Sequence, residues 1–220
     1  MHDIAVREEV LGSNEAAAQH NREHFREHRL YVANLMSGPG AGKTALLERA
    51  IDALAGRFRI GVVEGDVQGS ADAERIARHG VPVVQINTGG ACHLDARLVH
   101  KHLHALDLDA LDVLFIENVG NLVCPAEFDL GEHDKVMVLS VAEGADKPGK
   151  YPVMFHVSRV LLLNKVDLLP HVDFDLARAE RDARALNLDL EIFRVSARTG
   201  EGLDAWHRWL AGRIERARSL

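Results

Sequence analysis

The chain has 220 residues, 47% of them hydrophobic and 27% charged, which is typical of a soluble globular protein with one α/β domain. The net charge of −7 argues against nucleic acid or an anionic membrane as the main partner. No apolar run approaches the ~20 residues of a membrane span, the first residues are charged, and two cysteines are too few for a disulfide framework. We therefore expect a cytoplasmic protein.

Residues 4–29 have the composition of a single helix, with apolar positions sparse among Glu, Arg and His. We assign residues 1–29 to an N-terminal helical extension. Three histidines of this helix recur every fourth residue and therefore share one face; they are His20, His24 and His28. Such a face either binds a metal loosely or is simply solvated, and solvation is the preferred interpretation.

A strand-like run leads into the segment SGPGAGKT at residues 37–44, and a helical run over residues 45–54 follows. A strand, a glycine-rich turn and a helix in this order form a polyphosphate-binding site. The glycines turn successive backbone N–H groups inward, and the helix N-terminus adds a partial positive charge. Lys43 is expected to reach the β- and γ-phosphates, and Thr44 to ligate Mg²⁺. Ser37 replaces the first glycine of the usual pattern, but the Gly-Lys-Thr end is intact. The remaining predicted contacts to the nucleotide are Gly38, Pro39, Gly40, Ala41, Gly42 and Ala45.

Acidic residues at the carboxyl ends of parallel strands face the ligand side of an α/β sheet. The second predicted strand runs into Asp66, and Asp72 follows a few residues later, so both are candidates to hold Mg²⁺ or to orient water. The apolar strand over residues 111–117 ends at Glu117, a Walker B pattern in which the acid handles Mg²⁺ or positions the hydrolytic water. Gly120 is placed to approach the γ-phosphate.

Cys92 and His93 are adjacent in a loop that opens a predicted helix over residues 94–106. A helix N-terminus lowers a thiol pKa and favours the thiolate ligand, but two ligands do not make a site, since zinc and nickel usually take four. Cys124 follows the expected γ-phosphate sensor Gly120, where a metal ligand would respond to the nucleotide state. The alternative is that Cys124 is a small buried residue, as free cysteines often are.

The buried strand over residues 160–163 ends in the guanine-reading Asn-Lys-x-Asp motif of GTPases, formed here by Asn164, Lys165 and Asp167. The aspartate accepts hydrogen bonds from the N1 and 2-amino groups of guanine, which adenine does not offer, so the motif rejects ATP. After the last predicted strand, a loop is expected to pack on the base; its residues are Ser196, Ala197 and Arg198.

Lys147 and Lys150 lie in a predicted polar loop over residues 143–152, close to the expected nucleotide. They contact the nucleotide or a partner subunit, or are solvated. The other predicted elements are helices over residues 71–79, 175–186 and 202–216 and strands over residues 81–86, 135–141 and 190–195. This order of elements predicts an α/β fold, a doubly wound and mainly parallel sheet flanked by helices.

Together the motifs resemble the HypB family of GTPases, and the resemblance covers residues 4–217. The segments that carry it are the phosphate loop with Pro39, EGD at 64–66, TGGACHLD at 88–95, ENVGNLVCP at 117–125, DKP at 146–148 and NKVD at 164–167. The resemblance implies a SIMIBI-type P-loop GTPase domain with a metal site over residues 30–220, and GTP or GDP and Mg²⁺ as cofactors.

The resemblance further implies that Cys92, His93 and Cys124 bind Ni²⁺ or Zn²⁺ near a homodimer interface that GTP favours. The implied role is nickel delivery during [NiFe]-hydrogenase maturation, with other maturation proteins and the hydrogenase large-subunit precursor as partners. The chain has neither the N-terminal cysteine motif nor the long histidine-rich tract of some relatives. Nickel delivery is therefore expected to depend on the site in the GTPase domain.

We expect GTP and Mg²⁺ to be held by Lys43, Thr44, Glu117 and either Asp66 or Asp72, with water attacking the γ-phosphate in line. No glutamine stands in an obvious water-orienting place and no arginine finger is evident, so intrinsic hydrolysis is expected to be slow. Three alternatives remain: a urease-type nickel-insertion GTPase, which should show Cys-Pro-His; an ATP-using small-molecule kinase; and a non-catalytic metal-binding scaffold.

Overall fold

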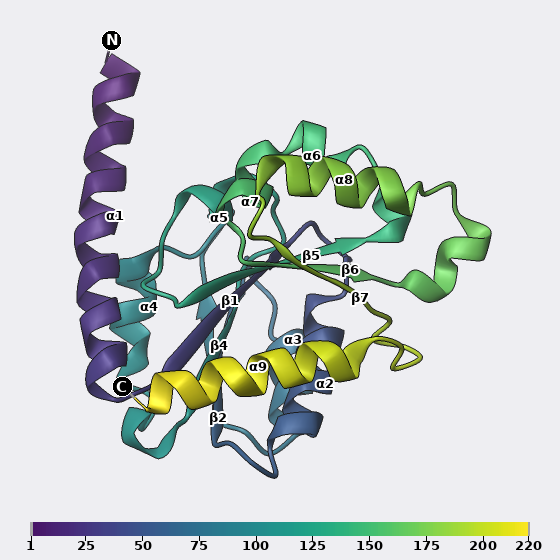
Figure 1. Cartoon of the computed structure of the whole chain (residues 1–220). Helices are drawn as coiled ribbons and strands as arrows, with labels where there is room; N and C mark the ends of the chain where they lie inside the picture. The colour runs from purple at the N-terminus through teal and green to yellow at the C-terminus, as the bar shows by residue number, and fades with distance from the viewer. Residues whose placement is uncertain (1, 220) are drawn as a thin grey trace.

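The computed structural model describes residues 2–219, with side chains from residue 9 onward. Seven parallel strands form one sheet in the order β3-β2-β4-β1-β5-β6-β7 (Figure 1). The strands are β1 (Tyr31–Ser37), β2 (Ile60–Asp66), β3 (Val83–Asn87), β4 (Val113–Glu117), β5 (Asp134–Ser140), β6 (Val160–Asn164) and β7 (Glu191–Arg194). The central strands are buried along their whole length, which explains their nearly continuous apolar sequences.

The chain runs from β1 to one edge of the sheet through β2 and β3, returns to β4 beside β1, and then builds the other edge. This reversal places a topological switch point at the carboxyl end of β1, where open α/β sheets bind their ligands. The helices are α1 (His2–Glu27), α2 (Lys43–Leu54), α3 (Ala71–Ala77), α4 (Ala96–Leu103), α5 (Cys124–Glu127), α6 (Lys147–Lys150), α7 (Pro152–Val157), α8 (Leu176–Leu186) and α9 (Leu203–Arg218). The doubly wound α/β fold predicted from the sequence is confirmed.

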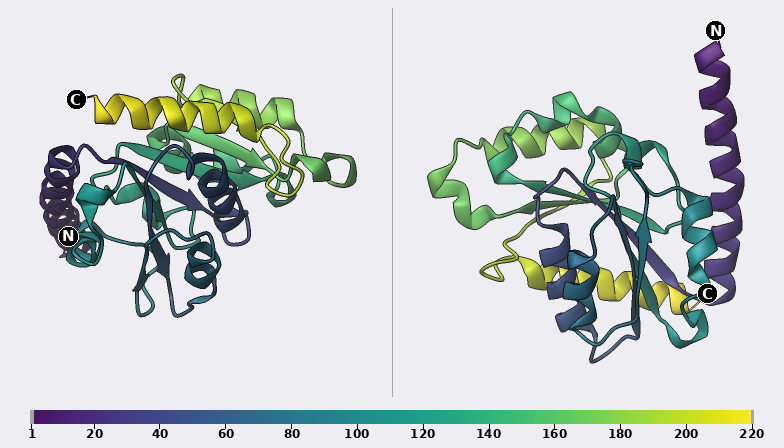
Figure 2. Two further views of the ribbon diagram at one scale, coloured as in Figure 1. Left: turned by 90° about the horizontal axis from the view of Figure 1, so that it is seen from below. Right: turned by 180° about the vertical axis from the view of Figure 1, so that it is seen from behind.

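Helices cover both faces of the sheet (Figure 2). On one face α2, α3 and α9 pack on the strands in one apolar cluster, to which α9 contributes Trp206, Leu210 and Ile214 at helical spacing. On the other face α1 and α4 cover the β2–β4 half, and the short helices α5–α7 with α8 cover the β5–β6 half. Within residues 2–219, no helix combines the length and the apolar character needed to cross a membrane.

Helix α1 lies against α4, and its N-terminal part projects beyond the rest of the molecule (Figure 1). Buried asparagine amides attach it: Asn14 Nδ2 donates to the Asp129 carbonyl at 2.8 Å, and Asn21 Nδ2 donates to the Ala96 carbonyl at 2.9 Å. Phe25 is fully buried in the cluster beneath. These polar contacts explain how a helix with few apolar positions is held on the domain.

Residues 143–152 are not the polar loop predicted from their composition. They follow a 3₁₀ turn at Val141–Glu143 and contain the helix α6 and the start of α7. Pro148 and Pro152 occupy the first turns of these helices, where a missing backbone N–H costs nothing because it has no intrahelical partner. The predicted helix over residues 94–106 is also shorter, because Asp95 caps α4 by accepting a hydrogen bond from the Leu98 N–H at 2.8 Å.

Candidate nucleotide and metal site

The phosphate loop lies between the end of β1 and the start of α2, as predicted. Gly42 precedes the helix with φ 101°, and a Cβ there would stand 2.5 Å from Asn164 Nδ2, so only glycine fits. No side chain caps the N-terminus of α2. Its first-turn N–H groups and its dipole are thus available to a phosphate anion.

Lys43 is buried, and its Nζ donates a hydrogen bond to Ser37 Oγ at 3.0 Å. Burial lowers the pKa of Lys43, while the surrounding carboxylates, led by Glu117 and Asp72, oppose that shift. Ser37, the residue that replaces the first glycine of the usual pattern, therefore holds Lys43, the predicted phosphate-binding lysine, in place. This role was not predicted from the motif.

Thr44 and Glu117 form the centre of the predicted Mg²⁺ site. Thr44 Oγ1 donates to Glu117 Oε1 at 2.7 Å, and burial raises the pKa of Glu117 to about 7. Asp72 is near enough to influence both Lys43 and Glu117, but it pairs with Arg75 at 3.0 Å. Asp66 accepts hydrogen bonds from two backbone N–H groups of its own turn, at 2.5 and 3.0 Å. The structure therefore brings Thr44 and Glu117 into contact and leaves the choice between Asp66 and Asp72 a prediction.

Glu64 is a further carboxylate in this site that the sequence did not single out. It pairs in register with Glu117 on the adjacent strand, it is 3% exposed, and its Oε2 has no hydrogen-bond partner. Burial, followed by the charge of Glu117, raises the pKa of Glu64 to about 8. Glu117 Oε2 is also buried without a partner. Two adjacent, unsatisfied carboxylate oxygens beside a threonine hydroxyl form an oxygen-donor set suited to Mg²⁺.

The nucleotide-free protein is expected to lose stability between about pH 4.3 and 8 because of Glu64. Its folded pKa of about 8 lies above the ~4.3 of a free glutamate, so the folded state keeps a proton that the unfolded chain releases. This contribution is fully present below about pH 4.3 and is lost as the pH rises through 8. Glu64→Gln should therefore flatten the pH dependence of the urea midpoint, measured with Mg²⁺ chelated.

The exposed Glu201→Gln variant serves as the control for this measurement and should follow the wild-type pH dependence. An unchanged pH dependence in Glu64→Gln would show that the Glu64 carboxyl titrates normally.

The guanine motif lines a cavity of about 340 Å³ next to the phosphate loop. Asn164 is buried at the end of β6, where its Nδ2 donates to the Ala41 carbonyl at 2.9 Å. Lys165 has φ 63°, and its Nζ donates to the Gly40 carbonyl at 2.7 Å. The motif thus supports the phosphate loop as well as the base pocket. The lining residues are Gly42, Ala45, Asn164, Lys165, Asp167, Leu168, Ala197 and Arg198.

Asp167, which is expected to read the base, is held by Ser196, whose Oγ donates to Asp167 Oδ1 at 2.6 Å. Arg198 is 3.8 Å from the other oxygen, Oδ2. Arg49 on α2 fixes the loop by donating to the Ala197 carbonyl at 2.8 Å. All three predicted residues of this loop therefore lie at the mouth of the base pocket or behind it.

Cys92, His93 and Cys124 meet in one place, with their ligand atoms all within 4.8 Å of one another. The two sulfur atoms are 2.8 Å apart, and Cys92 Sγ is 3.6 Å from His93 Nδ1. Burial lowers the pKa of His93, which favours the neutral ring that binds metals. The His93 ring packs at a tilt against Phe128, with the two ring centroids 3.9 Å apart. Hydrogen bonding between the Cys92 and Cys124 thiols, together with burial, raises the pKa of Cys124 to about 11, so a metal must displace that proton. Among the residues described here, this is the one group of three such ligands whose donor atoms already lie within 4.8 Å of one another.

Two asparagines connect the nucleotide site to this cluster, and neither was predicted as a site residue. Asn118 follows Glu117, and its Oδ1 accepts from the Leu94 N–H at 3.0 Å, two residues after Cys92. Asn121 Oδ1 accepts from the Cys124 N–H at 3.3 Å, and its Nδ2 is 3.8 Å from Cys124 Sγ. Both asparagines lie in the segment that leads from Glu117, the predicted Mg²⁺ ligand, to Cys124.

Gly120, between the two asparagines, contacts the phosphate loop. A Cβ at Gly120 would lie 3.2 Å from Pro39 Cα, so this backbone approaches the loop closely.

Lys147 lines a second cavity, of about 340 Å³, with Pro39 and Gly120, and its Nζ lies over the Tyr151 ring at 5.5 Å from the centroid. Lys150 instead pairs with Asp146 at 2.6 Å. Nucleotide contact by either lysine stays a prediction.

Asn118→Ala is expected to lower the free energy of unfolding by about 2 kcal/mol. The change leaves the buried Leu94 and Val119 N–H groups without the acceptor that now serves both, at 3.0 Å each. Urea unfolding measures the effect, with exposed Asn87→Ala as the control, expected to stay within about 0.5 kcal/mol of wild type. Equal stabilities for the two variants would contradict the assigned role of Asn118.

Comparison with known proteins identifies the family. The family model described as CobW/HypB/UreG, nucleotide-binding domain, matches residues 31–194. The hydrogenase maturation factor HypB of Azotobacter vinelandii is 54% identical over 207 residues, which cover 94% of this chain and 68% of that protein. The chain belongs to the HypB family. The resemblance inferred from the motifs is thereby confirmed.

Two solved structures of HypB proteins match nearly the whole fold. HypB from Helicobacter pylori in complex with nickel is 36% identical, with a TM-score of 0.88 over 93% of this chain and 96% of that one. HypB from Archaeoglobus fulgidus is 39% identical, with a TM-score of 0.87 over 92% of this chain and 99% of that one. The parallel sheet and its flanking helices are therefore the fold of these HypB proteins.

Proposed function

We propose that this protein is a GTP-hydrolysing metallochaperone that binds nickel, or zinc, at Cys92, His93 and Cys124 and delivers nickel during [NiFe]-hydrogenase maturation. Family membership supports the maturation role, and the nickel complex of the H. pylori protein supports the choice of metal. The observation that carries the proposal is the short connection from Glu117 to Cys124, which links a predicted Mg²⁺ ligand to a predicted nickel ligand.

In this proposal the residues of the chain position GTP for attack by water. Lys43 and the N–H groups at the start of α2 stabilise charge on the β- and γ-phosphates. Thr44, Glu117 and Glu64, with Asp66 or Asp72, would hold Mg²⁺, which neutralises phosphate charge when it is bound. The chain offers no evident glutamine to orient water and no evident arginine finger, so we expect slow intrinsic hydrolysis.

The nucleotide state reaches the metal through the segment from Glu117 to Cys124. Gly120 lies against the phosphate loop, so the γ-phosphate and its release act on this backbone. Asn121 bonds both to the backbone and toward the sulfur of Cys124, and therefore transmits a shift at Gly120 to that ligand. Coupling requires that the metal ligands differ in position between the two nucleotide states.

The three ligands of one chain leave at least one position on a four-coordinate metal open. A second copy of the chain supplies further ligands if the cluster lies at a GTP-promoted homodimer interface, which is part of the proposal. The open position also permits handover to an acceptor, for which we propose the hydrogenase large-subunit precursor, acting with other maturation proteins.

The test measures nickel affinity of the wild type with GDP and with a non-hydrolysable GTP analogue, together with phosphate release from GTP. We expect at least a tenfold difference in affinity between the two nucleotides, and loss of that difference in Asn121→Ala. Equal nickel affinity with GDP and with the GTP analogue would show that the two sites are not coupled. Competition of ATP with GTP would favour the kinase alternative, and absence of phosphate release with partner proteins present would favour a scaffold.

A further inference from the structure

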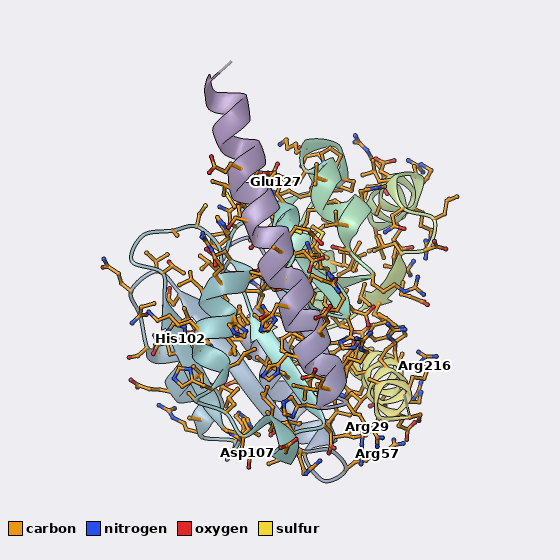
Figure 3. All side chains as sticks on the ribbon, turned by 90° about the vertical axis from the view of Figure 1, so that its left-hand side faces the viewer. Arg29, Arg57, His102, Asp107, Glu127 and Arg216 are labelled. Carbon is orange, nitrogen blue, oxygen red and sulfur yellow. The ribbon has the colours of Figure 1, made fainter. Side chains whose placement is uncertain are left out.

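Four imidazole rings meet where α1 lies against α4, away from the cysteine cluster. His20, His24 and His28 lie on one face of α1, as their spacing predicted, and α4 adds His100. The ring centroids of His20 and His100 are 4.7 Å apart, those of His24 and His100 6.2 Å, and those of His24 and His28 4.8 Å. Figure 3 looks onto this side of the molecule, with α1 in front and α4 beside it. A purely solvated face does not explain a fourth histidine supplied by a different helix.

Buried Asn21 fixes the tautomer of His100. Asn21 Nδ2 donates to the carbonyls of Ala96 and Leu130 at 2.9 and 3.0 Å, so its other atom, Oδ1, is an acceptor. His100 Nδ1 lies 3.0 Å from that oxygen and therefore carries the ring proton. The lone pair of His100 is then on Nε2. Metal-ligating histidines are held in this way, with the non-ligating nitrogen donating to a carbonyl or carboxylate.

A second histidine of the cluster is oriented by a carboxylate. His28 Nδ1 lies 2.7 Å from Asp109 Oδ1, an arrangement that also leaves Nε2 free. Partial burial of the ring against α1 lowers the pKa of His100, and the neighbouring His20 and His24 lower it further, which favours the neutral ring that can bind a metal. His20 and His100 are exposed, so an ion and its water molecules have direct access.

We propose that His20, His24 and His100 bind a divalent first-row transition ion, Ni²⁺, Zn²⁺ or Cu²⁺, at a second site on the protein. Imidazole is a ligand suited to all three ions. Two histidines four residues apart on a helix can direct their nitrogens to one ion, and His100 adds a third from the facing helix. The exposed rings turn about their side-chain bonds to bring the nitrogens to the ~2.0–2.1 Å of a metal–imidazole bond.

This site goes beyond the proposed function, because it uses none of the residues of the nucleotide or cysteine sites. One of its ligands, His100, is nevertheless close in the chain to Cys92 and His93 of the cysteine cluster. Cys92 and His93 immediately precede α4, and His100 lies on that same helix. Metal bound by the histidines would therefore be held on the element that leads from the cysteine cluster.

The experiment uses the full chain carrying Cys92→Ser and Cys124→Ser, titrated with nickel chloride near pH 7.5 in equilibrium dialysis. We expect one retained Ni²⁺ per chain, and at least a tenfold weaker affinity when either His20→Gln or His100→Gln is added. His102→Gln is the matched control, expected to stay within about twofold, because two residues turn about 200° around a helix and place His102 away from His100.

Circular dichroism and guanine-nucleotide affinity check that each variant is folded, and His20 is an exposed position at which misfolding is not expected. A second measurement adds zinc and follows the imidazole signals by NMR, where those of His20, His24 and His100 should shift while that of His102 stays. The proposal is overturned if the cysteine-free chain retains no nickel at millimolar concentration. It is equally overturned if His102→Gln weakens binding as much as His20→Gln.

Discussion

Cys124→Ser is expected to weaken nickel binding at the cysteine cluster by about a hundredfold or more. Cys124 is one of three ligand residues whose donor atoms lie within 4.8 Å of one another, so its loss leaves only Cys92 and His93. Even substitutions next to a metal ligand typically cost about 10–100-fold in affinity, and removal of a ligand should cost at least as much. Isothermal titration with Ni²⁺, in the presence of GDP, measures the loss.

Binding to the wild type should also become tighter as the pH rises from about 6 to 8. Hydrogen bonding between the Cys92 and Cys124 thiols, together with burial, raises the pKa of Cys124 to about 11, so the free protein keeps a proton that the metal must displace. Nickel titration in buffers with different heats of ionisation counts the released protons.

The control for the cysteine substitution is Val123→Ala, which changes the exposed side chain next to Cys124 and should leave nickel affinity within about twofold of wild type. GTP affinity should be unchanged in both variants, because neither side chain lines the base pocket. Nickel bound equally well by Cys124→Ser and wild type would refute the cysteine cluster as the binding site.

The position of the predicted nucleotide site in the fold could be anticipated because its signals are local in the sequence. A phosphate loop needs glycines, a lysine and a hydroxyl at fixed positions between a strand and a helix, and the structure places Gly42, Lys43 and Thr44 there. The guanine motif likewise follows directly from the end of a buried strand. In both cases a short segment contains the geometry as well as the chemistry.

The residues that the sequence did not reveal act through contacts distant in the chain. Glu64 is conspicuous only because strand pairing sets it beside Glu117. Asn118 can be recognised as a link between the nucleotide site and the cysteine cluster only once its hydrogen bond with the Leu94 N–H is known. His100 is recognisable as a candidate ligand only from its contact with Asn21 of α1, 79 positions earlier in the chain. Periodicity within one segment contains no information on such pairs.

The short helices α6 and α7 were missed for a different reason. Their proline and glycine residues are typical of loops, and composition alone favours that interpretation. In the structure Pro148 and Pro152 stand in first turns, and Met154 and Phe155 are fully buried against the sheet. Burial of these apolar side chains supplies the stability that such short helices lack in isolation.

Asp167→Asn is expected to lower GTP affinity by about a hundredfold to a thousandfold and to raise affinity for xanthosine triphosphate. The Asp167 carboxylate accepts from the N1 and 2-amino groups of guanine, and an amide in its place presents a donor to the 2-amino group instead. Xanthine has a carbonyl at that position, which accepts from the amide. The substitution keeps size and shape, and Ser196 Oγ, now 2.6 Å from Asp167 Oδ1, can donate to the amide oxygen.

Competition binding with a fluorescent guanine nucleotide measures both affinities, and the exposed Asp173→Asn serves as the matched control of the same chemistry. The control should keep the wild-type preference for GTP over both xanthosine triphosphate and ATP. A variant at Asp167 that still prefers GTP would mean that another group reads the base. Because Asp167 is remote from the cysteine cluster, its substitution should leave nickel affinity with no nucleotide unchanged. With xanthosine triphosphate bound, the variant should regain any dependence of nickel affinity on the γ-phosphate, which separates recognition of the base from the signal passed to Cys124.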